Sequence, residues 1–233
     1  MVRDAWRFDK SQWLLKQAVA STLLMGALAA YVLALMSSNS CTDSVLLSFG
    51  VIYSARLLFA TFVLWSRLPD WHETSIVYAV FMPAIFAMMY YGRNIMPYCV
   101  TTLYALVVCL YATGSWLSTV GEWQRYVFKA NPANKGKLMR TGLWAWSMHV
   151  NYLGDSTLFT GWTLAAAGAW WTWWVPIVIT TVFIFMHIPG LDECLAERYP
   201  AELPAYAAKT RKLVPRLSLC TSACCDWRAG TLR

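Results

Sequence analysis

Six long runs of apolar residues, separated by short polar segments, dominate the chain up to about residue 190. The length of each run is close to that of a helix that crosses the hydrocarbon core of a bilayer, which needs about 20 residues. None alternates polar and apolar residues with period two, as a transmembrane barrel strand would. The pattern therefore predicts an all-α, polytopic membrane protein with about six transmembrane helices. The runs are Gln17–Met36, Ser44–Ser66, Thr74–Tyr91, Ile95–Thr119, Ser156–Trp171 and Trp173–Pro189.

The composition agrees with a membrane protein and excludes several other classes. Of the 233 residues, 58% are hydrophobic and only 13% are charged. A soluble domain carries about a quarter charged residues, so an ordinary soluble globule and a disordered chain are both excluded. Six spans also leave no room for a separate soluble catalytic domain.

The basic residues predict the orientation. All Lys and Arg residues except Arg56 and Arg93 lie before the first run, or after the second, fourth or sixth run. With six spans these segments share one side of the membrane, and the positive-inside rule makes that side cytosolic. Both termini are then cytosolic. The net charge of +7 is explained by this topology and by anionic membrane lipids, so we expect no nucleic-acid partner.

One polar stretch, Gly121–Asp155, is unlike its apolar neighbours. Its first part extends the fourth run as a helix that carries Glu122, Arg125 and Lys129 near one face. A turn is predicted at Asn131–Gly136. Five polar residues then lie directly before the fifth run: Ser147, His149, Asn151, Tyr152 and Asp155. Such donors and acceptors at a membrane rim suit a polar ligand that carries phosphate. A capped helix start in the headgroup layer is the alternative, and the residues alone leave both open.

Other sequence motifs limit which cofactors and metals the chain is predicted to bind. No G-x-G-x-x-G or Walker sequence is present, so a bound nucleotide would lie outside a Rossmann fold. The histidines lack metal-ligand spacing, and we predict no metal site. Beyond the sixth run, Leu191–Tyr199 is predicted as an amphipathic cytosolic helix, followed by a basic arm at Lys209–Pro215. A tail at 218–233 contains three cysteines.

The segment Thr-Gly-Leu-Trp-Ala-Trp-Ser-Met-His-Val-Asn-Tyr-Leu-Gly-Asp at 141–155 resembles the hallmark of the steroid 5-alpha-reductase superfamily, in particular its branch of largely uncharacterised membrane proteins. The Glu122–Lys129 stretch resembles the superfamily in the same way. So does Ile188-Pro-Gly-Leu-Asp-Glu, which is followed by Glu197-Arg-Tyr199. The resemblance covers about residues 118–217, whereas the first four runs match only in hydropathy.

This resemblance implies a membrane-embedded reductase that passes hydride from NADPH to a double bond of a steroid or other unsaturated lipid. It implies an N-terminal membrane region at 1–119 on the substrate side and a cofactor region at 120–217. In eukaryotes the endoplasmic reticulum is the usual location, with a mitochondrial or bacterial inner membrane as alternatives. The implied catalytic residues are Tyr152 and Asp155; the implied cofactor-binding residues are Glu122, Arg125, Lys129, His149, Asn151, Glu197, Tyr199 and Arg211.

Two positions depart from the motif of that branch. Met148 stands where the branch has Arg, and Val150 stands where it has Pro. If the missing Arg leaves the phosphate end of the cofactor held by fewer cations, Met148→Arg should tighten NADPH binding. The departures also motivate a different function: a non-catalytic accessory subunit of a membrane complex. A third possibility is an S-adenosylmethionine-dependent methyltransferase of a lipidated substrate, because isoprenylcysteine carboxyl methyltransferases share the fold.

Overall fold

The computed structural model describes residues 10–36, 40–64, 71–94, 101–166 and 169–215. Within these residues every regular element is helical, which confirms the all-α prediction. The α-helices are α1 (Lys10–Met36), α2 (Cys41–Phe59), α3 (Trp71–Ser75), α4 (Met82–Gly92), α5 (Thr101–Ala130), α6 (Val150–Ala166), α7 (Trp174–Val182), α8 (Ile188–Arg198) and α9 (Leu203–Lys209). Short π-helical turns at Ala60–Leu64, Ile76–Phe81 and Phe183–His187 extend or join them, and 3-10 turns lie at Pro132–Asn134, Gly142–Ala145 and Trp170–Trp173.

Four continuous helical segments are long and apolar enough to cross a membrane: Trp13–Met36, Cys41–Leu64, Thr102–Ala130 and Trp170–Arg198. Many large apolar side chains on their outer surfaces are exposed, including Leu33 and Phe185, as expected for surfaces in contact with lipid. The predicted third run falls on a shorter apolar helix, Ile76–Gly92, and the fifth falls on α6. A membrane protein is therefore supported, and the number six stays a prediction.

The helix boundaries differ from the prediction at two places that affect the site. The sixth run and the predicted amphipathic helix form one continuous helical segment. The π turn at Phe183–His187 leads directly into α8, and Pro189 lies in the first turn of α8. A proline is tolerated there. Helix α6 begins at Val150, well before the predicted start at Ser156. The polar residues of the motif thus lie inside the first turns of α6.

Aromatic rings form the centre of the bundle. The Trp162 side chain is fully buried on α6 and contacts rings from three other helices, with centroid distances of 5.7 Å to Tyr53, 6.0 Å to Phe86 and 6.1 Å to Tyr111. Burial of several large rings around one residue gives most of the packing energy of such a core. This core fixes α6 against α2, α4 and α5.

Helices α5 and α6 approach each other through glycine. A Cβ atom at Gly114 would lie 2.4 Å from the Leu158 nitrogen, and one at Gly154 would lie 2.5 Å from the Ser118 nitrogen. Small residues allow such backbone-to-backbone contact between membrane helices. The position of α6 against α5 is therefore set by the two backbones.

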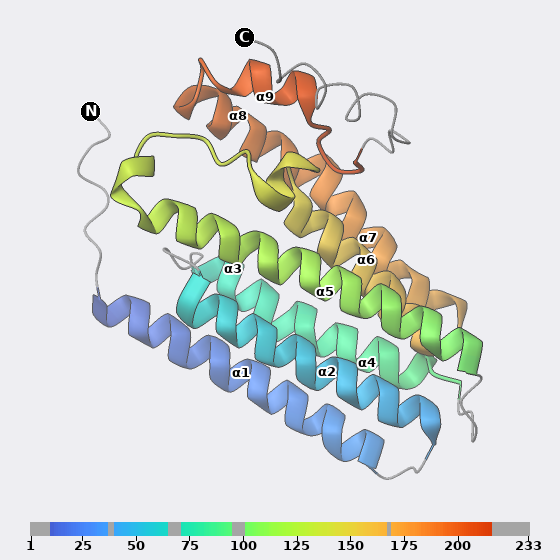
Figure 1. The fold of residues 1–233 in the computed structure, drawn as a ribbon. Helices are drawn as coiled ribbons and strands as arrows, with labels where there is room; N and C mark the ends of the chain where they lie inside the picture. The colour runs from blue at the N-terminus through green and yellow to red at the C-terminus, as the bar shows by residue number, and fades with distance from the viewer. Residues whose placement is uncertain (1–9, 37–39, 65–70, 95–100, 167–168, 216–233) are drawn as a thin grey trace.

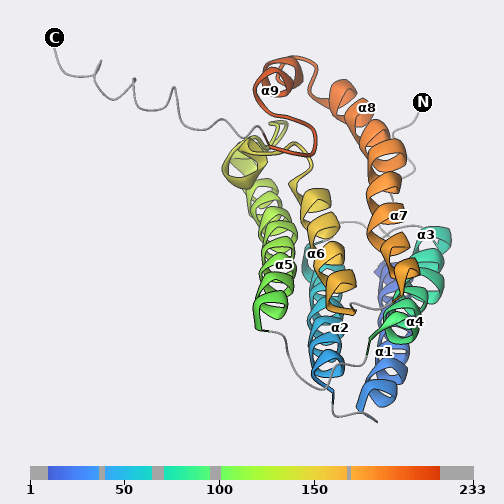
Figure 2. The ribbon, with the colours of Figure 1, turned by 90° about the vertical axis from the view of Figure 1, so that its right-hand side faces the viewer.

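The long helices lie side by side, and α8 and α9 project at one end of the bundle (Figures 1 and 2). The C-terminal end of α5 and the start of α6 lie at this same end (Figure 2). We call it the α9 end. Helix α5 crosses the predicted domain boundary at 119/120 without interruption. The predicted tail at 218–233 lies outside the described residues.

Candidate functional site

An ion pair joins the motif to the N-terminal helices. The Arg56 Nη2 atom on α2 donates to Asp155 Oδ1 on α6 at 2.6 Å, and the two side chains are 12% and 21% exposed. The Arg56 guanidinium also lies over the Tyr53 ring, 4.9 Å from its centroid. Charges within membrane-spanning helices are costly unless paired, and they commonly mark functional sites. The ion pair thereby joins α2 to the motif on α6.

Two buried polar atoms near this pair have no hydrogen-bond partner among the described residues. They are Asn151 Oδ1, one helical turn before Asp155 on α6, and Arg56 Nη1. Buried polar atoms in native proteins almost always have a partner, so each such exception calls for an explanation. An acceptor and a donor are thus left unsatisfied around one ion pair, and a ligand or a water can satisfy them.

His149 anchors the start of α6 to α8. Its Nε2 atom lies 3.0 Å from Asp192 Oδ1, and the Lys212 ammonium lies 2.6 Å from the other Asp192 oxygen. Burial lowers the pKa of the His149 imidazole below its ordinary value, although the hydrogen bond to Asp192 acts in the opposite direction. His149 is therefore a neutral hydrogen-bonding residue at neutral pH.

The basic arm after α9 pairs with the motif along the backbone. The Met148 nitrogen donates to the Arg211 carbonyl at 2.9 Å, and the His149 nitrogen donates to the Lys212 carbonyl at 3.0 Å. The Tyr206 hydroxyl donates to the Trp144 carbonyl at 2.5 Å. These bonds satisfy backbone groups just before α6, where the helix itself offers no partner. The arm is a structural part of the site.

A stack of rings continues from His149 along α6. The Tyr152 ring lies between His149, at 5.8 Å between centroids, and Phe183, at 4.2 Å, with interplanar angles of 12° and 16°. Offset stacking of this kind fixes the ring orientation. Tyr152 thus presents a fixed phenol next to the Asn151–Asp155 turn.

Basic side chains lie in the last turns of α5. Arg125 pairs with Glu122 at 3.4 Å, and its guanidinium lies 6.0 Å from the Trp144 ring centroid. Burial lowers the pKa of the Lys129 ammonium to about 8; the charges of Arg125 and Arg198 act in the same direction, and Glu122 acts in the opposite one. Three cations and one carboxylate leave a net positive cluster, which suits an anionic group such as a phosphate. We call Arg125, Lys129 and Arg198 the cation cluster.

The structure brings many, though not all, of the predicted site residues together. The group at the start of α6 and the end of α5 consists of Glu122, Arg125, Lys129, His149, Asn151, Tyr152 and Asp155, with Arg211 contributing backbone. By contrast, Glu197 is exposed on α8, and Tyr199 packs on an apolar cluster that contains Leu138 and Tyr206. Their assignment to cofactor binding stays a prediction.

Sequence reasoning assigned no role to Asp192, which links His149 to Lys212. The residue was part of the matched Ile-Pro-Gly-Leu-Asp-Glu segment, so the signal was present. Its partner could not be identified, because the two residues are 43 positions apart. Among the described residues, no group of three His, Cys, Asp or Glu side chains could hold a metal ion.

The two departures from the motif are core residues. Met148 is 3% exposed and packs with Leu138 and Tyr206. Val150 is fully buried with Leu117, Leu143 and Trp144. An arginine at 148 would place a cation in this apolar cluster, which is costly. The expectation that Met148→Arg restores a phosphate contact is therefore not supported by the geometry.

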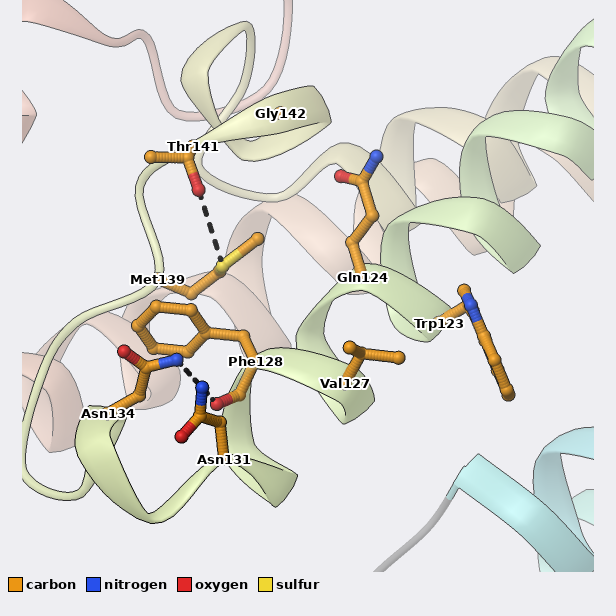
Figure 3. A pocket seen from close by; sticks show the side chains of 9 residues that line it. All are labelled: Trp123, Gln124, Val127, Phe128, Asn131, Asn134, Met139, Thr141 and Gly142. Atoms are coloured by element: carbon orange, nitrogen blue, oxygen red, sulfur yellow. Dashed lines mark hydrogen bonds between the residues drawn. The ribbon is translucent and has the colours of Figure 1, made fainter.

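Two grooves of similar size lie elsewhere. One, of about 440 Å³, lies between α2 and α5, and its walls include Phe49, Ile52 and Trp116. The other, of about 450 Å³, lies beside the C-terminal end of α5 (Figure 3). We call the second the Phe128 groove. Its lining residues are Trp123, Gln124, Val127, Phe128, Asn131, Asn134, Met139, Thr141 and Gly142.

Comparison with known sequences assigns the family. Residues 71–212, which include α3 to α9 and the described site residues other than Arg56, match DUF1295, a protein family of unknown function. The chain belongs to this family. DUF1295 is part of the steroid 5-alpha-reductase-like superfamily, in agreement with the resemblance of the 141–155 motif.

A second similarity covers a shorter part of the chain. The chain is 33% identical over 89 residues to the probable O-methyltransferase ustE of Ustilaginoidea virens. The match covers 38% of this chain and 31% of that relative, so this chain aligns with about a third of the relative's length.

Proposed function

We propose that this protein is a membrane-embedded, NADPH-dependent reductase of a double bond in a steroid or other unsaturated lipid. When bound, NADPH supplies a hydride and is oxidised to NADP⁺; the substrate gains that hydride at one carbon and a proton, taken from water, at the other. The observation that carries the proposal is the combination of the cation cluster with two unsatisfied polar atoms, Asn151 Oδ1 on α6 and Arg56 Nη1 on α2.

The residues of this chain fit the two ends of such a cofactor. Arg125, Lys129 and Arg198 would hold the phosphates, because charge-assisted bonds to phosphate are strong. The Asn151 Oδ1 atom would accept a hydrogen bond from the carboxamide of the nicotinamide. Asp155, paired with Arg56, would accept hydrogen bonds from the bound cofactor or substrate.

The lipid substrate would lie beside Arg56. The unsatisfied Nη1 atom of Arg56 is a donor next to apolar helices. It would bind an oxygen of the substrate, such as a carbonyl conjugated to the double bond. A site of this kind takes most of its binding energy from apolar burial, and few polar groups fix the orientation.

A methyltransferase is the second candidate, because of the similarity to the probable O-methyltransferase. S-adenosylmethionine carries a sulfonium cation and no phosphate, so the cation cluster favours NADPH over it. The accessory-subunit alternative rested on Met148 and Val150. Since both side chains pack in the core, these departures no longer argue for loss of the site.

The proposal includes an orientation with the α9 end in the cytosol. Lys and Arg residues concentrate in the segments at this end. At the opposite end, Cys41 at the start of α2 is disulfide-bonded, and disulfides persist mainly in oxidising compartments. A cysteine probe at Lys135 should react from the cytosolic side of sealed vesicles; reaction only after permeabilisation would refute the orientation.

Thermal melting of the purified protein in detergent tests the cofactor. We expect NADPH to raise the melting temperature more than NADH, because only NADPH has the additional phosphate for the cation cluster. Asn151→Ala should weaken NADPH binding about five- to 150-fold, since a lost buried hydrogen bond costs about 1–3 kcal/mol. Asn94→Ala, at the opposite end of the bundle, is the matched control. Stabilisation by S-adenosylmethionine alone would favour the methyltransferase, and stabilisation by neither would favour an accessory subunit.

A further inference from the structure

The Phe128 groove lies on the side of α5 opposite to the cation cluster. With 3.6 residues per turn, Arg125 and Lys129 fall on one side of this helix, whereas Trp123, Gln124 and Val127 fall on the other. The second set lines the groove (Figure 3). A nucleotide held by the cation cluster would therefore not occupy this groove. The proposed reductase function gives it no role.

The chemistry of the groove changes along α5. Trp123 and Val127 lie four residues apart on α5, about 6 Å along the helix axis at 1.5 Å per residue, and Asn131 follows directly after the helix ends at Ala130. The exposed Trp123 and Val127 side chains are apolar or aromatic, and Asn131 and Asn134 lie together at the other end of the groove (Figure 3). Tryptophan near a helix end marks the interface between hydrocarbon and headgroups. The Trp123 end of the groove is thus placed at this interface, and the Asn131 end lies on its headgroup side.

The polar end of the groove is bordered by a basic loop. Lys135, Lys137 and Arg140 are all exposed, and they flank the lining residues Asn134 and Met139 in the chain. No ion pair found among the described residues uses these three cations.

One carboxylate lies close to this loop. Glu202 Oε2 accepts a hydrogen bond from the Leu138 nitrogen at 3.4 Å. Three cations against one carboxylate leave the loop positive, which complements an anionic headgroup.

We propose that the Phe128 groove binds an anionic glycerophospholipid of the cytosolic leaflet. The phosphate lies at the Arg140 loop with Asn131 and Asn134, and an acyl chain runs along Val127 toward Trp123. This site is independent of the proposed reductase activity, because it uses the other side of α5. The lipid would also contact the wall formed by Gln124 and Gly142. There Gln124 Oε1 accepts from the Leu143 nitrogen at 2.9 Å, so bound lipid would stabilise the turn that leads into the motif.

Native mass spectrometry and thermal melting of the delipidated, full-length protein test this site. The probes are phosphatidylglycerol and phosphatidylcholine with identical acyl chains, and glycerophosphate as a headgroup without chains. We expect tighter binding and a higher melting temperature with phosphatidylglycerol, and no effect of glycerophosphate at equal concentration. Equal affinity for the two lipids would overturn the proposal. An equal effect of glycerophosphate would show a phosphate site without a lipid site, which also overturns it.

Two pairs of variants locate the site. Arg140→Gln should reduce phosphatidylglycerol affinity about fivefold, because a basic residue near an anionic surface contributes about 1 kcal/mol. Lys209→Gln on α9 removes a cation elsewhere at the same end and should leave the affinity unchanged. Val127→Trp should fill the groove and weaken both lipids, unlike Leu33→Trp on the exposed surface of α1. If each variant behaves like its control, the lipid binds elsewhere and the proposal is wrong. These results do not depend on NADPH, so either proposal can fail alone.

Discussion

Replacing Gly154 by Ala should force α5 and α6 apart. The added Cβ atom would lie 2.5 Å from the Ser118 nitrogen, 2.7 Å from the Gly114 carbonyl oxygen and 2.9 Å from the Ser118 Cβ. Ordinary contacts between such atoms are about 3.5–4.0 Å, so the helices must separate by about 1 Å. Two of the three atoms belong to the backbone and cannot rotate away. The cost should therefore reach the upper end of the about 1–3 kcal/mol range for overpacking.

The assay is thermal melting in one detergent, with Gly26→Ala as the matched control. Gly26 lies inside α1, and an added Cβ there would meet nothing within 4 Å. Alanine favours a helix over glycine by up to about 1 kcal/mol, so this control should melt at or slightly above the wild-type temperature. Gly154→Ala should melt about 6–12 °C lower, using about 2–4 °C per kcal/mol for a chain of this size. A melting temperature within about one degree of wild type would refute the close backbone contact.

Three further predictions concern the site. Arg56→Gln and Asp155→Asn should each destabilise the protein by about 3–5 kcal/mol, because each leaves a buried charge unpaired; in a double-mutant cycle the double variant should cost clearly less than the sum, and additive costs would contradict the ion pair. Met148→Arg should lower the melting temperature without recovery on NADPH addition, whereas tighter NADPH binding would show that the side chain reaches the cofactor. For His149, the unfolded state binds a proton below about pH 6.5, whereas burial keeps the imidazole of the folded state neutral to a lower pH. As the pH is lowered below about 6.5, wild-type stability should therefore decrease more steeply than that of His149→Gln. Parallel pH profiles of the two proteins would contradict this.

Much of the fold could be predicted from hydropathy, because a helix in lipid must satisfy its own backbone. The helical extension of the fourth run to Lys129 and the turn at Asn131 also followed from local rules. The start of α6 at Val150 could not be predicted in this way. It is fixed by hydrogen bonds to the Arg211 and Lys212 carbonyls, which come from a distant segment.

The same limit applies to the candidate site. The motif residues Asn151 and Asp155 were apparent from their types and from the resemblance. However, the pairing of Asp155 with Arg56 joins residues 99 positions apart. Arg56 was recognisable only as a charge within an apolar run. The partner of such a charge depends on how the helices pack, and single-sequence patterns do not determine this.

The arm that pairs with the motif has a consequence for biosynthesis. The start of α6 and its backbone partners are separated by more than 60 residues of chain, and translation proceeds from the N-terminus. During synthesis the helices through α6 can enter the membrane and pack while Thr210–Lys212 are still to be added. This rim of the site can therefore close only after Thr210–Lys212 leave the ribosome. A chain interrupted between α8 and α9 would retain its apolar helices, but Met148 and His149 would lose their backbone acceptors.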